Sequence, residues 1–278
     1  MRVVDLVEFH QRRIAYTAPM ALIEKHPAGS FCWVELATSN QLAAKEFYAG
    51  LFGWRCVDSP MGPGDFYTTF RIQDRKAAAG YTLRPDEVAL GIPPHWNLYI
   101  TVANADDATE IAKESGGKIF CGPLDVHTHG RMSTIADPTG AVFYIWESKE
   151  HPGMGVQREN ASFCWADLST PDPVRAAEFY GKVFGWSMMT GDDGYVHIAN
   201  DGDYIGGIPP VTRRDSNTPP HWMAYFQVDD CDVSTDRAKG LGANVFAGPM
   251  TIEGVGRMTV LADPQGAVFS LFQPLSGK

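Results

Sequence analysis

The segment FCWVELAT at Phe31–Thr38 recurs as FCWADLST at Phe163–Thr170, and this repeat decides the fold. Four further blocks recur in the same order: EFYAGLFGW at Glu46–Trp54 and EFYGKVFGW at Glu178–Trp186, PPHW at Pro93–Trp96 and Pro219–Trp222, GRM at Gly130–Met132 and Gly256–Met258, and ADPTGAVF at Ala136–Phe143 and ADPQGAVF at Ala262–Phe269. The offset is 132 residues in the first two blocks and 126 in the others. One six-residue change in length between Trp54 and Gly80 would explain the difference.

The repeat divides the chain into two domains of ordinary size. We predict an N-terminal extension (1–28), a first domain (29–148), a linker (149–159) and a second domain (160–278). A domain of about 120 residues can bury a core without disulfides or a structural metal. The hydrophobic content of 44% and the charged content of 20% are typical of globular proteins.

Charge and hydropathy exclude several classes of partner. The net charge of -10 argues against nucleic acid, because phosphate binding needs a concentrated positive surface. No apolar run reaches the length of about 20 residues that a membrane helix needs. Charged residues among the first thirteen leave no room for the apolar region of a signal peptide. Five cysteines, an odd number without a CxxC pair, favour reduced thiols and a cytoplasmic location.

Each copy predicts the order strand, helix, strands, and then the same order again. Alternating large residues predict a strand at 31–36, and Ser39 or Asn40 can cap the helix that follows. In the second copy the cap is Asp172, which precedes a proline. Gly53 and Gly185 stand where the chain leaves the helix in a left-handed conformation. The fold class is therefore α+β, with two βαβββ modules in each domain.

This order of elements, with the Phe-Tyr and Phe-Gly-Trp helix signature and the Asp-Pro-x-Gly turn, resembles the vicinal oxygen chelate superfamily. That superfamily contains glyoxalase I, extradiol dioxygenases, and the bleomycin and fosfomycin resistance proteins. The resemblance covers about residues 30–148 and 160–274, and the tandem form is similar to bacterial two-domain glyoxalase-like proteins. It implies that two modules form a U-shaped sheet that cups the site, with the helices outside. It also implies metal ligands on the first and last strands of each module.

The standard ligand positions hold residues that do not suit a metal. Three positions in each copy are Trp33, Asn97 and Tyr144, and Trp165, Met223 and Ser270. The fourth ligand position lies on the last strand of the first module, around Gly80 and Gly206, and no acidic residue stands in register there. Divalent metal sites need imidazole nitrogen or carboxylate oxygen. We therefore expect no metal and no other cofactor. The alternative is a divalent metal with displaced ligands, either Glu35 with His95 or the first-copy pair His127 and His129.

Strand alternation predicts what lines each cup instead. The acids Glu35 and Asp167 and the histidines His95 and His221 point inward, as candidate catalytic residues or polar anchors. The candidate ligand-binding residues are Trp33, Tyr99, Tyr144, Trp165 and Tyr225 in the cups and Arg131 and Arg257 at the sheet rim. Structural alternatives stay open: a carboxylate bonded to backbone amides or arginine, a histidine fixed after Pro-Pro, and arginines in salt bridges.

Two functions remain. The first is a binding protein that holds a small aromatic or apolar molecule in a metal-free cup, as the resistance-protein branch sequesters its ligand. The second is an enzyme of the glyoxalase or dioxygenase type, a lyase, isomerase or oxygenase, with Glu35 and Asp167 as bases and His95 and His221 as partners. Either function implies a small-molecule partner, and a homodimer is a further expectation. The unequal copies also leave open that only one cup binds.

Overall fold

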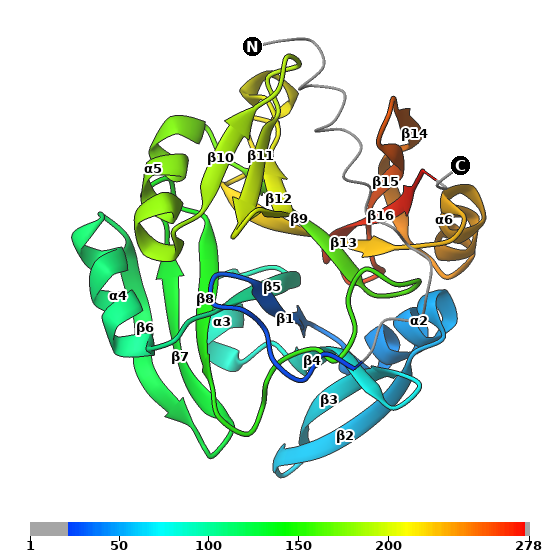
Figure 1. Ribbon diagram of the computed structural model, residues 1–278. Helices are drawn as coiled ribbons and strands as arrows, with labels where there is room; N and C mark the ends of the chain where they lie inside the picture. The colour runs from blue at the N-terminus through cyan, green and yellow to red at the C-terminus, as the bar shows by residue number, and fades with distance from the viewer. Residues whose placement is uncertain (1–21, 276–278) are drawn as a thin grey trace.

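The computed structural model describes residues 22–275, which form two eight-stranded mixed sheets (Figure 1). The first half contains β1 (Phe31–Thr38), α2 (Gln41–Phe52), β2 (Arg55–Gly62), β3 (Asp65–Ile72), β4 (Arg75–Thr82), α3 (Pro85–Ala89), β5 (His95–Thr101), α4 (Ala105–Glu114), β6 (Lys118–Val126), β7 (Gly130–Ala136) and β8 (Val142–Ser148). The second half contains β9 (Phe163–Ser169), α5 (Pro173–Phe184), β10 (Ser187–Thr190), β11 (Val196–Asn200), β12 (Asp203–Ile208), the 3-10 turn η1 (Val211–Arg213), β13 (His221–Gln227), α6 (Cys231–Gly240), β14 (Asn244–Ile252), β15 (Gly256–Ala262) and β16 (Val268–Pro274). Most of the predicted N-terminal extension, residues 1–21, lies outside the described residues.

Each sheet consists of two βαβββ modules side by side, which confirms the predicted fold class. The first sheet has the order β2-β3-β4-β1-β5-β8-β7-β6, and the second repeats it as β10-β11-β12-β9-β13-β16-β15-β14. Within a module the first and last strands are parallel, because a helix and two strands connect them. The antiparallel pair β1 and β5 joins the two modules. The short elements α3 and η1, which were not predicted, lie in the connections between modules.

The signals predicted to begin and end the module helices act as expected. The side chains of Asn40 and Asp172 each accept a hydrogen bond from the backbone N–H three residues further on. Gly53 and Gly185 end α2 and α5 with φ of 71° and 73°, the left-handed region that glycine adopts without strain. The equal capping of both copies gives two helices of equal length.

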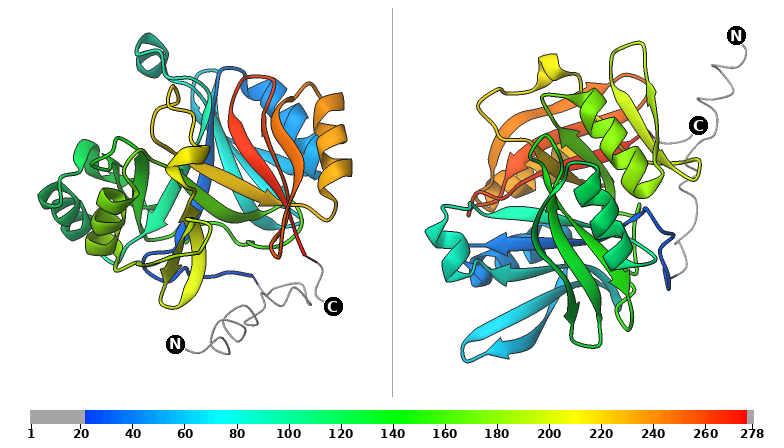
Figure 2. Two further views of the ribbon diagram at one scale, coloured as in Figure 1. Left: turned by 90° about the horizontal axis from the view of Figure 1, so that it is seen from above. Right: turned by 90° about the vertical axis from the view of Figure 1, so that its left-hand side faces the viewer.

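The helices lie on one face of each sheet and meet in two pairs at opposite sides of the molecule, where the two domains adjoin (Figure 2). Helix α4 of the first domain packs against α5 of the second, and α2 packs against α6. Aromatic rings join the two sheets at the centre: Phe31 lies 5.8 Å from Phe163 and 5.3 Å from Trp222, measured between ring centroids. The two domains therefore share one apolar core, which stabilises them as a unit.

The repeated Phe-Tyr and Asp-Pro motifs hold the domains together. Tyr48 on α2 donates a hydrogen bond to Asp263 of the other domain at 3.0 Å and accepts one from Trp96 Nε1 at 3.1 Å. Tyr180 on α5 donates to Asp137 at 3.0 Å in the reciprocal contact. The second oxygen of each aspartate accepts backbone N–H groups of its own tight turn. The motifs that reveal the repeat are thus the contacts across its pseudo-twofold interface.

The difference in length between the copies is divided between two places, which corrects the single change predicted. Thr68 pairs with Gly80 as Val196 pairs with Ile208, so that Tyr67 corresponds to Tyr195. The offset is therefore 132 at Trp54, 128 at Tyr67 and 126 at the Pro-Pro-His-Trp block. The first copy has four more residues than the second in the β2–β3 hairpin, and two more between β4 and β5. Ala79 therefore corresponds to Gly207 and not to Ile205.

Candidate ligand-binding site

Each sheet has one face that packs on the helices and an opposite face, which we call the cup. In β1 the residues Val34 and Leu36 face the shared core, whereas Trp33 and Glu35 face the first cup. In β9 the alternation is the same, and it places Trp165 and Asp167 in the second cup. The predicted inward direction of these side chains follows from the pleat, since successive residues of a strand point to opposite faces.

Hydroxyl groups of tyrosine hold the acid of the first cup. Glu35 is 8% exposed. Its Oε1 accepts a hydrogen bond from Tyr67 Oη at 2.7 Å, and its Oε2 accepts one from Tyr99 Oη at 2.9 Å. The Trp33 indole Nε1 donates to Tyr67 Oη at 3.0 Å. No arginine or backbone amide bonds Glu35 among the described residues, so its partners differ from those that the structural alternative assumed.

The second cup repeats this arrangement with a shorter acid. Asp167 is 6% exposed, and it accepts hydrogen bonds from Tyr195 Oη and Tyr225 Oη, both at 2.6 Å. The Trp165 indole Nε1 lies 3.0 Å from Asp167 Oδ1 and 2.9 Å from Tyr195 Oη. Both cups therefore contain one carboxylate, two phenols and one indole. Charge-assisted hydrogen bonds of this kind are the stronger class, which explains how a buried acid is accommodated.

The sequence analysis missed Tyr67 and Tyr195, although both copies contain them. A tyrosine near the start of the third strand in both copies was the available signal, but the prediction of a single change in length left the two residues unaligned. Tyr195 also depends on a glycine, because a Cβ at Gly207 would lie 2.0 Å from Tyr195 Oη. The corresponding residue in the first cup is Ala79, where the longer Glu35 reaches toward Tyr67. A long acid beside alanine (Glu35 and Ala79) and a short acid beside glycine (Asp167 and Gly207) thus both allow a hydrogen bond between the acid and a tyrosine hydroxyl.

Burial dominates the electrostatics of both acids. Desolvation raises the pKa of Glu35 and of Asp167, and the tyrosine hydrogen bonds oppose this shift. The pKa values of Tyr67 and Tyr195 are raised as well, first by burial and then by the adjacent carboxylates. The phenols therefore remain protonated donors, and each acid is held in an apolar setting where its charged form is disfavoured.

The two candidate histidines do not bond to the acids. His95 Nδ1 lies 2.8 Å from the carbonyl oxygen of Pro93, and its Nε2 lies 2.9 Å from Asn97 Oδ1. His221 Nδ1 lies 2.9 Å from the carbonyl oxygen of Pro219. Both rings are thus fixed by the Pro-Pro turn at the entrance of the strand, as the structural interpretation expected. An acid–histidine pair in direct contact is not assembled in either cup.

The structure does not bring Arg131 and Arg257 to the cups, which corrects their assignment as ligand-binding residues. Arg131 forms an ion pair with Asp106 of α4 at 2.7 Å, and Arg257 forms one with Asp232 of α6 at 2.5 Å. Both pairs lie on the face that the helices cover. The reason is strand parity: Arg131 shares its face with Ser133, which contacts α4. The salt-bridge alternative describes these arginines.

The donor groups of the cups do not fit a divalent metal. The structure places Trp33, Asn97 and Tyr144 on neighbouring strands of the first cup, and Trp165, Met223 and Ser270 in the second. Glu35 and Asp167 stand beside Ala79 and Gly207, which supply no ligand atom. Among residues 22–275 no group of three or more His, Cys, Asp or Glu side chains is arranged to hold a metal ion.

Histidines from the linker and the β6–β7 turn lie at one end of the first cup. His127 adopts a positive φ of 48° in the turn, and its ring centroid lies 6.4 Å from that of His129. His151 of the linker packs edge-on against Trp33 at 4.6 Å, and burial lowers its pKa to about 4. His151 therefore remains neutral near pH 7 and covers this end of the cup as an uncharged ring.

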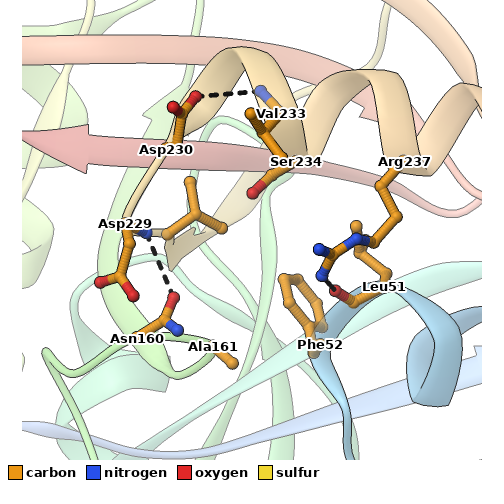
Figure 3. Close-up of a pocket in the computed structure, with 10 residues that line it drawn as sticks. Leu51, Phe52, Asn160, Ala161, Asp229, Asp230, Val233, Ser234 and Arg237 are labelled. Atoms are coloured by element: carbon orange, nitrogen blue, oxygen red, sulfur yellow. Dashed lines mark hydrogen bonds between the residues drawn. The ribbon is translucent and has the colours of Figure 1, made fainter.

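Two recesses lie outside the cups, at the junction of the domains. Figure 3 shows the first, between the end of α2 at Leu51 and Phe52 and the start of α6. Arg237 of α6 donates to the Leu51 carbonyl oxygen there at 3.3 Å. The second recess is its pseudo-symmetric counterpart beside Val183 and Phe184 at the end of α5. Both follow from the way the helices meet across the interface.

Comparison with known proteins places the chain in a family. Residues 30–145 match the model of the "Glyoxalase/Bleomycin resistance protein/Dioxygenase superfamily", and residues 165–272 match that of the "Glyoxalase-like domain". The protein named "Putative glyoxylase CFP32" of Mycobacterium bovis is 36% identical over 249 residues, which cover 87% of this chain and 94% of that protein. The chain belongs to the glyoxalase/bleomycin resistance protein/dioxygenase superfamily. The resemblance predicted from the repeated motifs is confirmed.

Other known proteins resemble this chain over most of its length. The "Anthracycline biosynthesis protein DnrV" of Streptomyces peucetius is 31% identical over 264 residues, with 90% of this chain and 94% of that protein covered. Among solved structures, the Mn(II)-bound glyoxalase from Novosphingobium aromaticivorans aligns with a TM-score of 0.63 at 17% identity, covering 90% of this chain and 83% of that one. A catechol 2,3-dioxygenase aligns with a TM-score of 0.61 at 15% identity, covering 91% of each chain. These structural likenesses show the shared fold.

Proposed function

We propose that this superfamily member binds a small aromatic or apolar molecule in its cups without a metal ion. The observation that carries the proposal is the repeated constellation of a buried acid, two phenols and an indole in each cup, next to expected ligand positions whose residues do not suit a metal. Trp33, Tyr99 and Tyr144 supply aromatic surface in the first cup, and Trp165 and Tyr225 supply it in the second. Binding sites for small molecules are mostly apolar, with few well-placed polar groups. Glu35 and Asp167 are the polar anchors in this account.

The relatives DnrV and DauV are named for anthracycline biosynthesis. An anthracycline has flat fused rings, and a ligand of that kind suits a cup lined with aromatic side chains. We therefore propose a planar aromatic compound as the type of ligand. The five cysteines, all free among the described residues, support the proposal of a reducing, cytoplasmic location.

An anthracycline titration followed by quenching of tryptophan fluorescence tests this function. We expect saturable binding by the full chain that a chelator leaves unchanged. Trp33→Ala or Trp165→Ala should weaken binding while far-UV circular dichroism and the melting temperature show a folded protein. Binding that equals wild type in both variants, or that disappears with the chelator, would contradict the proposal.

A second candidate is an enzyme of the lyase or dioxygenase type. The raised pKa of Glu35 and Asp167 favours it, because a buried carboxylate of raised pKa is a suitable general base. His95 and His221 would then position or protonate the substrate. In glyoxalase and extradiol dioxygenase assays, Glu35→Gln should abolish turnover at an unchanged melting temperature. Full activity in that variant would remove Glu35 from the mechanism.

A further inference from the structure

The two recesses at the domain junction are built from equivalent residues. We call the recess between the end of α2 and the start of α6 the α6 recess, and its counterpart between the end of α5 and the start of α4 the α4 recess. Their lining residues correspond pairwise through the offsets of the repeat. The apolar wall is the same in both: Leu51 and Phe52 of the α6 recess stand where Val183 and Phe184 stand in the α4 recess.

The two recesses differ in their polar groups. Four lining positions are polar or charged in the α6 recess and apolar in the α4 recess: Asn160, Asp229, Ser234 and Arg237 against Ala28, Ala103, Ala108 and Ile111. At one position the reverse holds, with Val233 against Asp107. Because the α4 recess forms the same helix contacts with alanine and isoleucine, the packing of the domains does not require the polar groups of the α6 recess.

The protein itself uses few of these polar groups. The Arg237 guanidinium has five N–H donors, and one of them bonds the Leu51 carbonyl oxygen at 3.3 Å. The Asn160 side chain accepts a hydrogen bond from the Asp229 backbone N–H at 3.2 Å. Among residues 22–275 neither Arg237 nor the Asp229 carboxylate forms an ion pair, and the Ser234 hydroxyl forms no hydrogen bond. A cation, an anion and a hydroxyl are therefore available around one recess.

The size and layout of the α6 recess limit its occupant. Its volume of about 170 Å³ lies below the roughly 300–1,000 Å³ of sites for drug-sized molecules, so the occupant is small. Figure 3 shows Arg237 and Asp229 on opposite sides, with Ser234 and Phe52 between them. The buried Val228 and the half-buried Phe52 supply apolar surface. The recess thus offers opposite charges at its two sides and an apolar floor.

We propose that the α6 recess binds a small amino acid in its zwitterionic form. The ligand carboxylate pairs with Arg237 and accepts a hydrogen bond from Ser234, its ammonium pairs with Asp229, and its apolar side chain lies on Phe52. A simple anion is disfavoured by Asp229 and a simple cation by Arg237, whereas a zwitterion satisfies both charges. The site lies outside the cups, so this inference stands apart from the proposed function.

The test uses L-valine as the probe and 1H–15N NMR spectra of the full-length chain as the readout. Millimolar L-valine should shift the amide signals of Ala161 and Ser234 saturably. It should leave the signals of Gly29 and Ala108, their counterparts in the α4 recess, unchanged. Isovalerate lacks the ammonium group and isobutylamine lacks the carboxylate, so each should bind at least about fivefold more weakly than L-valine.

Two variants take their new residue from the other copy of the repeat, where it already fits the fold. Arg237→Ile and Asp229→Ala should each weaken the binding of L-valine about fivefold or more. Ile111→Ala in the α4 recess is the matched control, and it should bind L-valine like wild type. The NMR spectrum of each variant also shows whether it is folded.

Four results would overturn the inference. They are the absence of a saturable shift with L-valine, equal shifts in both recesses, undiminished affinity in a folded Arg237→Ile or Asp229→Ala variant, and equal affinity for L-valine and either single-charge analogue. None of these results bears on ligand binding in the cups, which the anthracycline titration measures separately.

Discussion

Gly207→Ala should destabilise the second cup, and Asp167→Glu should reverse part of the loss. A Cβ at position 207 would lie 2.0 Å from Tyr195 Oη and 2.1 Å from its Cζ, so the ring must move away from the sheet. That movement breaks the 2.6 Å hydrogen bond to Asp167. A hydrogen bond to a charged group contributes about 1.5–3 kcal/mol, and overpacking costs about 1–3 kcal/mol. We expect the free energy of unfolding to fall by about 2.5–6 kcal/mol if both costs apply in full.

The longer acid supplies the compensation. In the first cup, Glu35 accepts from Tyr67 at 2.7 Å beside Ala79, so the combination of glutamate and alanine is already compatible with this fold. The double variant Asp167→Glu with Gly207→Ala gives the second cup the same combination. Urea unfolding followed by tryptophan fluorescence provides the four free energies of the cycle. We expect the double variant to be more stable than Gly207→Ala alone. Additive losses, or a neutral Gly207→Ala, would refute the reasoning.

Two further predictions concern the interface and the acids. Tyr48→Phe and Tyr180→Phe should each lower the free energy of unfolding by about 1–3 kcal/mol, because a buried aspartate and a buried indole N–H lose their partner; urea unfolding with losses below about 0.5 kcal/mol in both variants would contradict the described interface. Burial raises the pKa of Asp167 in the folded protein, so its protonated form favours folding. The stability of wild type relative to Asp167→Asn should therefore fall as the pH rises above about 4, the ordinary aspartate range; a relative stability that is flat or rises over this range would show the sign to be wrong.

The repeat allowed much of the fold to be predicted from sequence. Each strand, cap and turn appears twice, so a pattern seen in one copy could be checked in the other. Asn40, Gly53 and the Asp-Pro-x-Gly turn are local signals whose physical cause lies within a few residues. The strand alternation also placed Trp33 and Glu35 correctly on one face. These features required no knowledge of how the domains meet.

The features that sequence missed depend on contacts between distant segments. Tyr67 and Tyr195 reach the acids from the β2–β3 and β10–β11 hairpins, whose different lengths hid their equivalence. Arg131 and Arg257, predicted as ligand-binding residues at the sheet rim, instead pair with acids of α4 and α6, because strand parity turns them toward the helices. The packing of α2 and α5 against the other domain depends on Tyr48 and Tyr180, whose hydrogen-bond partners lie in the other copy. A single helix pattern carries no information on such a partner.

The most direct test of the central claim is the metal content of the protein. Tag-free protein prepared without chelators should be analysed for transition metals, expressed as moles of each metal per chain. The account predicts far less than one metal per chain and no change in anthracycline binding when a metal is added. Near-stoichiometric zinc, nickel, iron or manganese would contradict it, and would show that Glu35, His95 or the His127 and His129 pair bind metal in an arrangement different from the one described.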